Sequence, residues 1–174
     1  VEASQEALYY FRTKHGLLQA QERQTVTTSK TSELNSELMK SEIKKSELQV
    51  RLQHLQSVLL NRHQNGALDW SKLDASPEVL ASPLIQILRA QEIRVSGNVA
   101  ELSDKYGALH PRMARAEAEL RDLHARIQDE FRKIYDSVKQ EYDTAVTRER
   151  KMKETVARHN NDKIDVEKHE IEHG

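Results

Sequence analysis

Cysteine is missing from this chain of 174 residues. Its absence excludes disulfide bonds, thiol catalysis and thiolate metal sites, and it fits any redox compartment. Aromatic residues are scarce at 5%, and hydrophobic residues reach only 37%, below the roughly 45–50% of typical compact domains. This is too little apolar material for a thick globular core, but it is enough for the narrow seams of a coiled coil.

Glycine and proline are also rare, with 5 and 3 residues, which argues against a disordered linker and against a loop-rich β fold. Charge of one sign is lacking too, because 27 basic and 28 acidic residues are interleaved. We therefore expect no nucleic-acid partner and no polybasic membrane patch. We find no signal-peptide pattern in the given residues, and no apolar run approaches the ~20 residues of a membrane span. Since the chain starts at Val1, not Met, we expect a fragment of a longer protein.

Helical hydrophobic spacing is the main positive signal. In the first half of the chain, one set of residues recurs in steps of four and three: Leu34, Leu38, Ser41, Lys45, Leu48, Leu52, Leu55 and Leu59. This is the 3.5-residue repeat of a coiled-coil seam. Its two polar members weaken helix pairing and often fix its register.

Glycine, proline and candidate capping residues predict where the helices begin and end. His15-Gly16 is a stop signal, Thr27 or Thr28 is a candidate cap, Asn65-Gly66 is a turn signal, and Ser76-Pro77 and Ser82-Pro83 are helix starts. The resulting segments are a short helix 1–16, a long helix 27–61, a connector 62–82, a helix 83–105, a turn 106–111, a long helix 112–160 and a polar tail 161–174.

Apolar stripes are predicted on the later elements as well. The helix 83–105 carries Leu84, Leu88, Gln91, Val95, Asn98 and Leu102, and the helix after it carries Met113, Ala116, Leu120, Leu123, Ile127, Phe131, Ile134, Val138, Tyr142, Ala145, Met152 and Val156. The connector should pack on the helices through Leu68, Trp70, Leu73, Val79 and Leu80. We interpret Trp70 as a packing anchor, and we expect Tyr10 and Tyr142 to pack in seams.

A sharp turn separates the last two helices, at Tyr106-Gly107-Ala108-Leu109-His110-Pro111. Gly107 offers a backbone conformation that other residues resist, and Pro111 suits a first helical position. His110 is interpreted as satisfying backbone groups of the turn. The predicted fold is all-α, an elongated antiparallel helical hairpin or coiled-coil stalk.

One short stretch has the spacing of an enzyme motif, His169-Glu170-Ile171-Glu172-His173. It matches the H-E-x-x-H zinc pattern, in which histidines one turn apart share a helix face. No third ligand follows it, and the composition supplies no globular cleft, so we interpret it as a chance match. No nucleophile elbow or phosphate-binding glycine loop is found. The sequence predicts no catalytic, cofactor-binding or metal residue, and hence no enzyme in this fragment.

Three stretches together resemble a known family: the opening run Ala7–Leu17, the run Ser82–Glu92 and the run Glu101–Met113. They are similar to the periplasmic region of bacterial polysaccharide co-polymerases, the Wzz/GumC-type chain-length determinants and Wzc-like exopolysaccharide transport proteins. Ala108 stands where that family often has proline. By this resemblance, the hairpin tip would be shaped by Ser82, Pro83, Leu84, Tyr106, Gly107, His110 and Pro111.

The resemblance implies that residues 1–174 are a single periplasmic hairpin region of an inner-membrane protein, anchored through segments outside this chain. Its role would be a scaffold that governs chain length and export of an exopolysaccharide or capsule. Implied partners are further copies in a ring, a polysaccharide polymerase with its nascent glycan, and an outer-membrane export channel. A cytoplasmic tyrosine-kinase domain would lie outside this chain.

Three other interpretations remain open on sequence alone. A periplasmic adaptor of the membrane-fusion type also has a long helical hairpin, flanked by lipoyl-like β domains. A generic cytoplasmic coiled-coil scaffold would show the same periodicity. A zinc peptidase would need a third ligand after His173.

Overall fold

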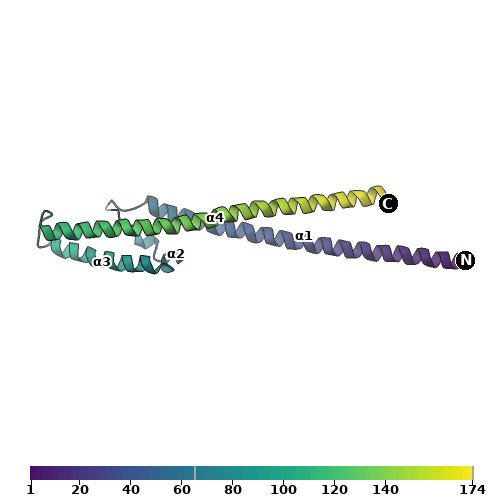
Figure 1. Ribbon diagram of the computed structural model, residues 1–174, viewed down its shortest axis with the longest axis horizontal. Helices are drawn as coiled ribbons and strands as arrows, with labels where there is room; N and C mark the ends of the chain where they lie inside the picture. The colour runs from purple at the N-terminus through teal and green to yellow at the C-terminus, as the bar shows by residue number, and fades with distance from the viewer. Residues whose placement is uncertain (65, 174) are drawn as a thin grey trace. The chain divides into compact units, whose positions relative to one another are not determined.

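The computed structural model describes residues 1–64 and 66–173, and every regular element among them is helical (Figure 1). In chain order these are the helix α1 (Glu2–Leu60), the 3-10 helix η1 (Trp70–Lys72), and the helices α2 (Pro77–Leu80), α3 (Pro83–Ser103) and α4 (Pro111–His173). The all-α hairpin prediction is confirmed. Asn65 of the predicted turn and Gly174 of the predicted tail lie outside the described residues.

The chain divides into two compact units. Unit 1 combines residues 1–45 with the chain from Thr144 onward, and unit 2 is Ser46–Asp143. Each unit contains part of α1 and part of α4, so the hairpin pairing is described for each unit in turn.

The predicted break after residue 16 is wrong, because α1 is continuous from Glu2 to Leu60. A lone glycine costs a helix only about 1 kcal/mol relative to alanine, and Gly16 does not adopt the positive φ that would end the helix. The predicted caps Thr27 and Thr28 are interior residues. Thr31 shows the pattern of this stretch, since its hydroxyl donates to the carbonyl of Thr27 at 2.9 Å, a bond typical of helix interiors.

The later boundaries lie closer to the predicted ones. Helix α3 ends at Ser103, and α4 begins at Pro111 as expected. Helix α4 continues to His173, through the segment predicted as a separate polar tail. That segment contains no glycine or proline before residue 174, so nothing in its backbone chemistry stops the helix.

In unit 1 the two long helices pair antiparallel through the predicted seam. On the α1 side Leu34 is buried and Leu38, Ser41 and Lys45 are half-buried. On the α4 side Ala145 and Glu149 are buried. Closer to the N-terminus the seam is not covered: Tyr10 is 68% exposed, so its predicted packing is wrong. The facing end of α4 is exposed from residue 160 onward and offers mostly polar side chains.

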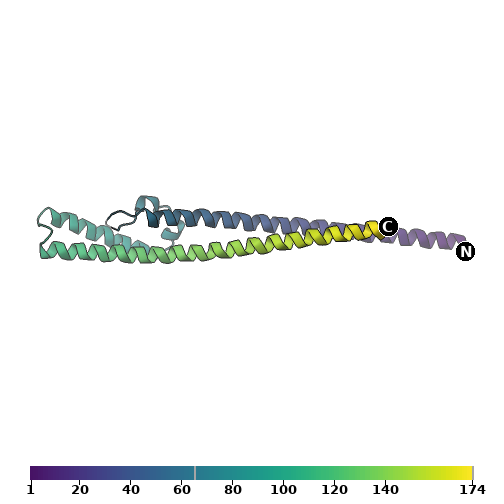
Figure 2. The ribbon, with the colours of Figure 1, turned by 90° about the horizontal axis from the view of Figure 1, so that it is seen from above.

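Unit 2 holds the thicker core. Helices α3 and α4 lie side by side in both ribbon views (Figures 1 and 2), and the α1 segment of this unit adds its own buried seam. The α4 stripe is confirmed, with Phe131 fully buried at its centre. The side chains with the least exposure in this core are Leu48, Leu55, Val58, Leu68, Leu73, Val79, Ile85, Val95, Ile127 and Phe131.

The predicted α3 stripe is correct only at alternate positions. Leu88 and Val95 are buried as expected, but Leu84 is 47% exposed and Asn98 is exposed. The other buried positions of α3 are Ile85 and Glu92. The observed stripe is shifted by one residue at every second position of the predicted stripe. It therefore buries Ile85 in place of Leu84 and leaves Asn98 exposed.

The connector packs on unit 2, as predicted. Leu68, Leu73 and Val79 are buried, whereas Leu80 is 63% exposed and does not join them. Gly66 has a φ of 85°, a left-handed conformation that glycine adopts without strain. This confirms the glycine half of the predicted turn. The connector therefore belongs to the core of the unit.

Candidate functional site

The start of α3 is capped by Ser82, as the sequence indicates. The Ser82 hydroxyl accepts a hydrogen bond from the backbone N–H of Ile85 at 3.3 Å, and Pro83 occupies the first turn. The proline nitrogen has no hydrogen to leave unsatisfied, and its φ already suits a helix. The parallel Ser76-Pro77 pair also opens a helix, but the Ser76 hydroxyl donates to Glu78 Oε2 at 2.8 Å and makes no cap bond.

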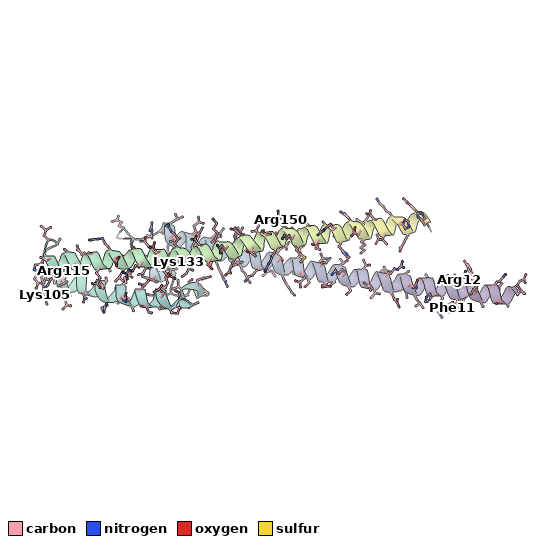
Figure 3. The ribbon with its side chains drawn as sticks, in the orientation of Figure 1. Phe11, Arg12, Lys105, Arg115, Lys133 and Arg150 are labelled. Atoms are coloured by element: carbon pink, nitrogen blue, oxygen red, sulfur yellow. The ribbon has the colours of Figure 1, made fainter. Side chains whose placement is uncertain are left out.

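The turn between α3 and α4 is held by His110. Its Nδ1 accepts from the backbone N–H of Arg112 at 3.2 Å, and its ring stacks on Tyr106 with centroids 4.0 Å apart. The backbone N–H of His110 donates to the Gly107 carbonyl at 3.0 Å. His110 thus caps α4, which confirms its predicted role. Lys105 and Arg115 mark the two sides of this turn in Figure 3.

The predicted special backbone conformation of Gly107 is wrong. Among the described residues only Gly66 has a positive φ, so the bend needs no conformation reserved for glycine. A Cβ built at position 107 would meet no atom within 4 Å. The turn is shaped by the ring stack and by Pro111, and Gly107 contributes a carbonyl.

The predicted tip residues do not form one site. Ser82, Pro83 and Leu84 lie at the beginning of α3, next to α2, whereas the residues of the turn follow its end. A helix of 21 residues separates the two groups by roughly 30 Å. Only Tyr106, Gly107, His110 and Pro111 belong to the turn, and the other group orients α3 on the connector.

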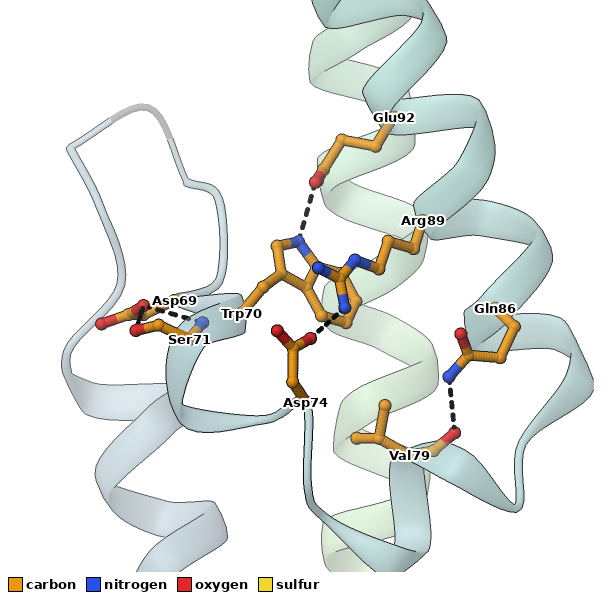
Figure 4. A network of polar contacts seen from close by, with 8 residues as sticks. All are labelled: Asp69, Trp70, Ser71, Asp74, Val79, Gln86, Arg89 and Glu92. Carbon is orange, nitrogen blue, oxygen red and sulfur yellow. Dashed lines mark hydrogen bonds and ion pairs between the residues drawn. The ribbon is translucent and has the colours of Figure 1, made fainter.

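A partly buried polar cluster in unit 2 was missed by sequence reasoning (Figure 4). Trp70 Nε1 donates to Glu92 Oε1 at 2.8 Å, and the second oxygen of Glu92 lies 3.3 Å from His124 Nε2. Arg89 lies over the Trp70 ring, 4.7 Å from its centroid, and pairs with Asp74. Glu92 and His124 are 8% and 6% exposed. The available signal was that Glu92 falls on the apolar face defined by Ile85, Leu88 and Val95.

This cluster joins the connector to α3 and α4. Trp70 and Asp74 come from the connector, Arg89 and Glu92 from α3, and His124 from α4. A buried carboxylate needs partners. The indole N–H of Trp70 satisfies Glu92 Oε1, whereas Oε2 lies near the His124 imidazole and makes no hydrogen bond. One face of Trp70 is covered by Arg89, which supports its interpretation as a packing anchor and leaves that face closed to a ligand.

Within the connector, η1 is held by its own local hydrogen bonds. Asp69 caps this 3-10 helix by accepting from the backbone N–H of Ser71 at 3.2 Å and from its hydroxyl at 2.5 Å. These hydrogen bonds, the Ser71 side chain first, lower the pKa of the Asp69 carboxyl below its ordinary value. The cap thus holds the turn that presents Trp70.

Two polar layers interrupt the seam of unit 1. In the first, the Glu149 carboxylate accepts from Lys153 at 2.9 Å and from Lys45 at 3.1 Å. The hydrogen bonds from Lys153 and then Lys45 lower the pKa of Glu149, and the bond to Glu149 raises the pKa of Lys153. In the second, Thr31 Oγ1 lies 2.8 Å from His159 Nε2. Both layers connect α1 to α4 at matching positions and so specify one antiparallel register.

Unit 1 also carries two surface grooves. One lies between α1 and α4 and is lined by Ala20, Arg23, Gln24, Thr27, Thr28, His159, Asp162, Lys163, Val166, Glu167 and Glu170. The other is open and runs along α1 alone, lined by Gln21, Gln24, Thr25, Thr28, Ser29, Ser32, Glu33 and Ser36. The first mixes both signs of charge, and the second is almost free of charge.

The H-E-x-x-H string lies in the exposed last turns of α4. The rings of His169 and His173 are 4.3 Å apart, and His173 Nδ1 is 3.1 Å from the His169 carbonyl oxygen. Among the described residues, no group of three or more His, Cys, Asp or Glu side chains is placed to hold a metal ion. None of the described helices is both long enough and apolar enough to cross a membrane.

Comparison with known proteins finds a similarity that covers most of the chain. The chain is 24% identical, over 147 residues, to the succinoglycan biosynthesis transport protein ExoP of Rhizobium meliloti (strain 1021). The aligned region covers 84% of this chain and 18% of ExoP, so the chain spans under a fifth of the relative. The similarity points to the polysaccharide transport and co-polymerase family. No family model matches the chain, and no solved structure matches it.

Proposed function

We propose that this chain is a non-catalytic scaffold region of an inner-membrane protein, that it faces the periplasm, and that it controls the chain length and export of an exopolysaccharide. The observation that carries the proposal is the similarity to ExoP across 84% of the chain. That protein is named for succinoglycan biosynthesis and transport. The membrane anchors belong to segments outside this chain.

The distribution of polar groups supports a scaffold. In unit 2, the buried Glu92 accepts a hydrogen bond from Trp70 and lies 3.3 Å from the buried His124. In unit 1, Glu149 is engaged by two lysines. Groups used in this way stabilise helix packing and register, so the proposed work of the region is positional.

The proposed partners are further copies of the chain in a ring, a polysaccharide polymerase with its nascent glycan, and an outer-membrane export channel. Large apolar side chains exposed along α1 support assembly, because contiguous exposed apolar surface marks interaction sites. Phe11, labelled with Arg12 in Figure 3, is 66% exposed, and Leu8 and Leu18 beside it in helical spacing are about half exposed.

The test is made in the bacterium that encodes the full-length protein. Deletion of the gene is expected to deplete high-molecular-weight exopolysaccharide or to shift its chain length, as measured by size-exclusion chromatography with light scattering. Restoring the wild-type gene should reverse the defect, whereas a gene carrying Ile127→Pro should not, because proline breaks α4 within the core. Ile127→Val is the matched control. Unchanged polysaccharide in the deletion strain would refute the proposal.

A further inference from the structure

The side of α1 that faces away from α4 in unit 1 carries a second heptad pattern. Its positions are 8, 11, 15, 18, 22, 25, 29, 32, 36, 39 and 43, which alternate in steps of three and four. From position 25 onward, each lies two residues before a covered position of the seam with α4. Two residues correspond to about 200° of rotation around the helix, so the two patterns lie on opposite sides of α1. We call the second set the outer seam.

Large apolar side chains occupy both ends of the outer seam. All of its positions are exposed, and the five large apolar ones are between 50% and 66% exposed: Leu8, Phe11, Leu18, Met39 and Ile43. The His15 ring stacks on Phe11 with centroids 5.9 Å apart, which extends the flat surface at the N-terminal end. Exposed apolar side chains that repeat in a heptad indicate a face that another helix covers.

Small hydroxyl side chains occupy the middle of the outer seam. Thr25, Ser29, Ser32 and Ser36 line the open groove along α1 described above. Serine and threonine are poorer helix formers than the leucine, lysine and glutamate used elsewhere in α1, so helix stability does not account for them. Small side chains let a second helix approach closely. Because the seven-residue spacing continues through this stretch, the whole outer seam suits one supercoiled helix as its occupant.

We propose that the outer seam binds the outer seam of a second copy of this chain, with the two α1 helices parallel and in register. The inference rests on the proposed function, in which copies form a ring, and it names the face through which the copies meet. Copies anchored in one membrane point the same way, so their α1 helices run parallel. Around a symmetry axis along the helices, each position meets itself, and the apolar positions therefore match.

Charge and area are compatible with this pairing. In a parallel coiled coil, the residue that flanks one side of the seam faces the residue five positions later in the partner helix. Positions 8–43 extend over roughly 54 Å, and a stripe about 10 Å wide would bury roughly 1,100 Å² on two copies, near the lower limit of a specific interface. The flanking pairs from residue 14 to residue 40 bring no like charges together: Lys14–Gln19, Gln21–Val26, Thr28–Glu33 and Asn35–Lys40.

Glu22 limits the strength of the association. It is the one acidic residue of the outer seam, and in the parallel pairing the two Glu22 carboxylates lie opposite each other and repel. The separate chain therefore associates weakly, and anchoring in one membrane supplies the effective concentration. Glu22→Leu should raise the association constant of the 174-residue chain at least about tenfold in sedimentation equilibrium. Glu37→Leu, at an exposed position off the outer seam, should leave the association constant unchanged.

The direct test is disulfide trapping in membranes. These 174 residues contain no cysteine, so an introduced cysteine reports its own contacts. The full-length protein, with any cysteines outside this region replaced by serine, is expressed in its bacterium and oxidised. Ser36→Cys should form a disulfide-linked dimer, because the in-register pairing brings the two Cα atoms within the roughly 4.4–6.8 Å that a disulfide requires. Glu37→Cys, one residue further along the helix, should form at least about tenfold less dimer.

Two double variants in the Ser36→Cys background compare the two sides of α1. Phe11→Ala/Leu18→Ala removes apolar surface from the outer seam and should reduce the linked dimer at least about threefold. Tyr10→Ala/Leu17→Ala is the matched control, because these neighbouring side chains are 68% and 63% exposed but lie on the other side of the helix. Alanine favours the helix, so circular dichroism of the 174-residue variants should show that α1 is intact.

Four results would each overturn the inference. They are the absence of a Ser36→Cys dimer in membranes, equal linking by Glu37→Cys, an equal loss of dimer in the two double variants, and an unchanged association constant for Glu22→Leu. In each case a polysaccharide defect in the deletion strain would still support the proposed function.

Discussion

Histidine side chains have distinct tasks in this protein, and their neighbours decide the tautomer of two of them. At His110 the ring nitrogen Nδ1 accepts a hydrogen bond from the Arg112 backbone, so that nitrogen carries no hydrogen. At His159, by contrast, Nε2 carries a hydrogen. The Thr31 hydroxyl donates its only hydrogen to the Thr27 carbonyl. In the 2.8 Å contact with His159, Nε2 must therefore donate and the Thr31 oxygen must accept.

The two turn glycines should respond to alanine in opposite ways. Gly66→Ala forces a side chain into a φ of 85° and brings a Cβ to 3.2 Å from Gln128 Nε2, which should destabilise unit 2 by about 1–2 kcal/mol. Gly107→Ala meets no atom within 4 Å and should be neutral or stabilise by up to about 1 kcal/mol. Urea denaturation followed by circular dichroism measures both, and a larger loss for Gly107→Ala would contradict the described turn.

The Ser82 cap should be worth about 1 kcal/mol to unit 2, with a range of roughly 0.5–2. Ser82→Ala removes the acceptor for the Ile85 N–H, while Ser82→Asp should retain most of the stability because aspartate also caps. The same urea experiment on Ser96→Ala, an exposed mid-helix serine, provides the baseline. Equal stability of Ser82→Ala and Ser96→Ala would show that the cap contributes nothing.

Helix ends and helix seams in this fold rely on different chemistry. The start of α3 uses a serine and a proline, the start of α4 uses a histidine and a proline, and both arrangements satisfy orphan backbone N–H groups. The seam of unit 1 instead alternates apolar contacts with polar layers. Such layers reduce the stability of a coiled coil but penalise every register in which the polar groups lose their partners.

The Glu149 layer makes the pairing of unit 1 sensitive to acid. Interaction with Lys153 and Lys45 lowers the pKa of Glu149 below its ordinary value of 4.5, so its contribution is present above that value and is lost as the pH falls through the lowered pKa. Lys153, whose pKa is raised, contributes below the ordinary lysine value, and that contribution is lost as the pH rises through the raised pKa.

Thermal unfolding followed by circular dichroism should therefore show a larger loss of stability between pH 6 and pH 3 for the wild type than for Glu149→Gln. Glu141→Gln, at an exposed position on the same helix, is the matched control and should follow the wild type. If Glu149→Gln and the wild type lose equal stability over this range, the lowered pKa is refuted.

At the scale of the whole molecule, the two units bury very different amounts of apolar surface. Unit 2 contains Phe131, Ile127 and most of the other fully buried side chains, and the connector adds Leu68, Leu73 and Val79. Unit 1 has a single seam with polar interruptions, and α1 residues before Thr27 are exposed throughout. Because burial is the main source of stability, local opening should be easier in unit 1.

Native-state hydrogen exchange should report this difference. Amides near Ile127 and Phe131 should exchange at a rate close to that of global unfolding, and amides of residues 5–24 should exchange at least about tenfold faster. Low denaturant should accelerate the slow group alone. Equal protection along α1 and α4 would show that the chain opens as one cooperative unit.

Much of the architecture follows from local chemistry that is readable in the sequence. The periodicity of Leu34 to Leu59 and of Met113 to Val156 specifies helices and their buried faces, and Ser82-Pro83 specifies where α3 begins. The candidate site was less predictable. Glu92 looked like one more surface carboxylate, and only the arrival of Trp70 and His124 from other segments makes its burial possible.

Periodicity, capping residues and composition were sufficient for the all-α class, for the antiparallel hairpin and for most of the buried positions, because each depends on residues within a few turns of one another. Gly16 continues α1 although the residues around it are exposed, because one glycine costs a helix only about 1 kcal/mol. The α3 stripe that includes Glu92, and the cluster that Glu92 forms with Trp70 and His124, were decided by the tertiary structure. These features depend on which side chains from distant segments come into contact, and packing energy between elements exceeds the weak local preferences that a single carboxylate expresses.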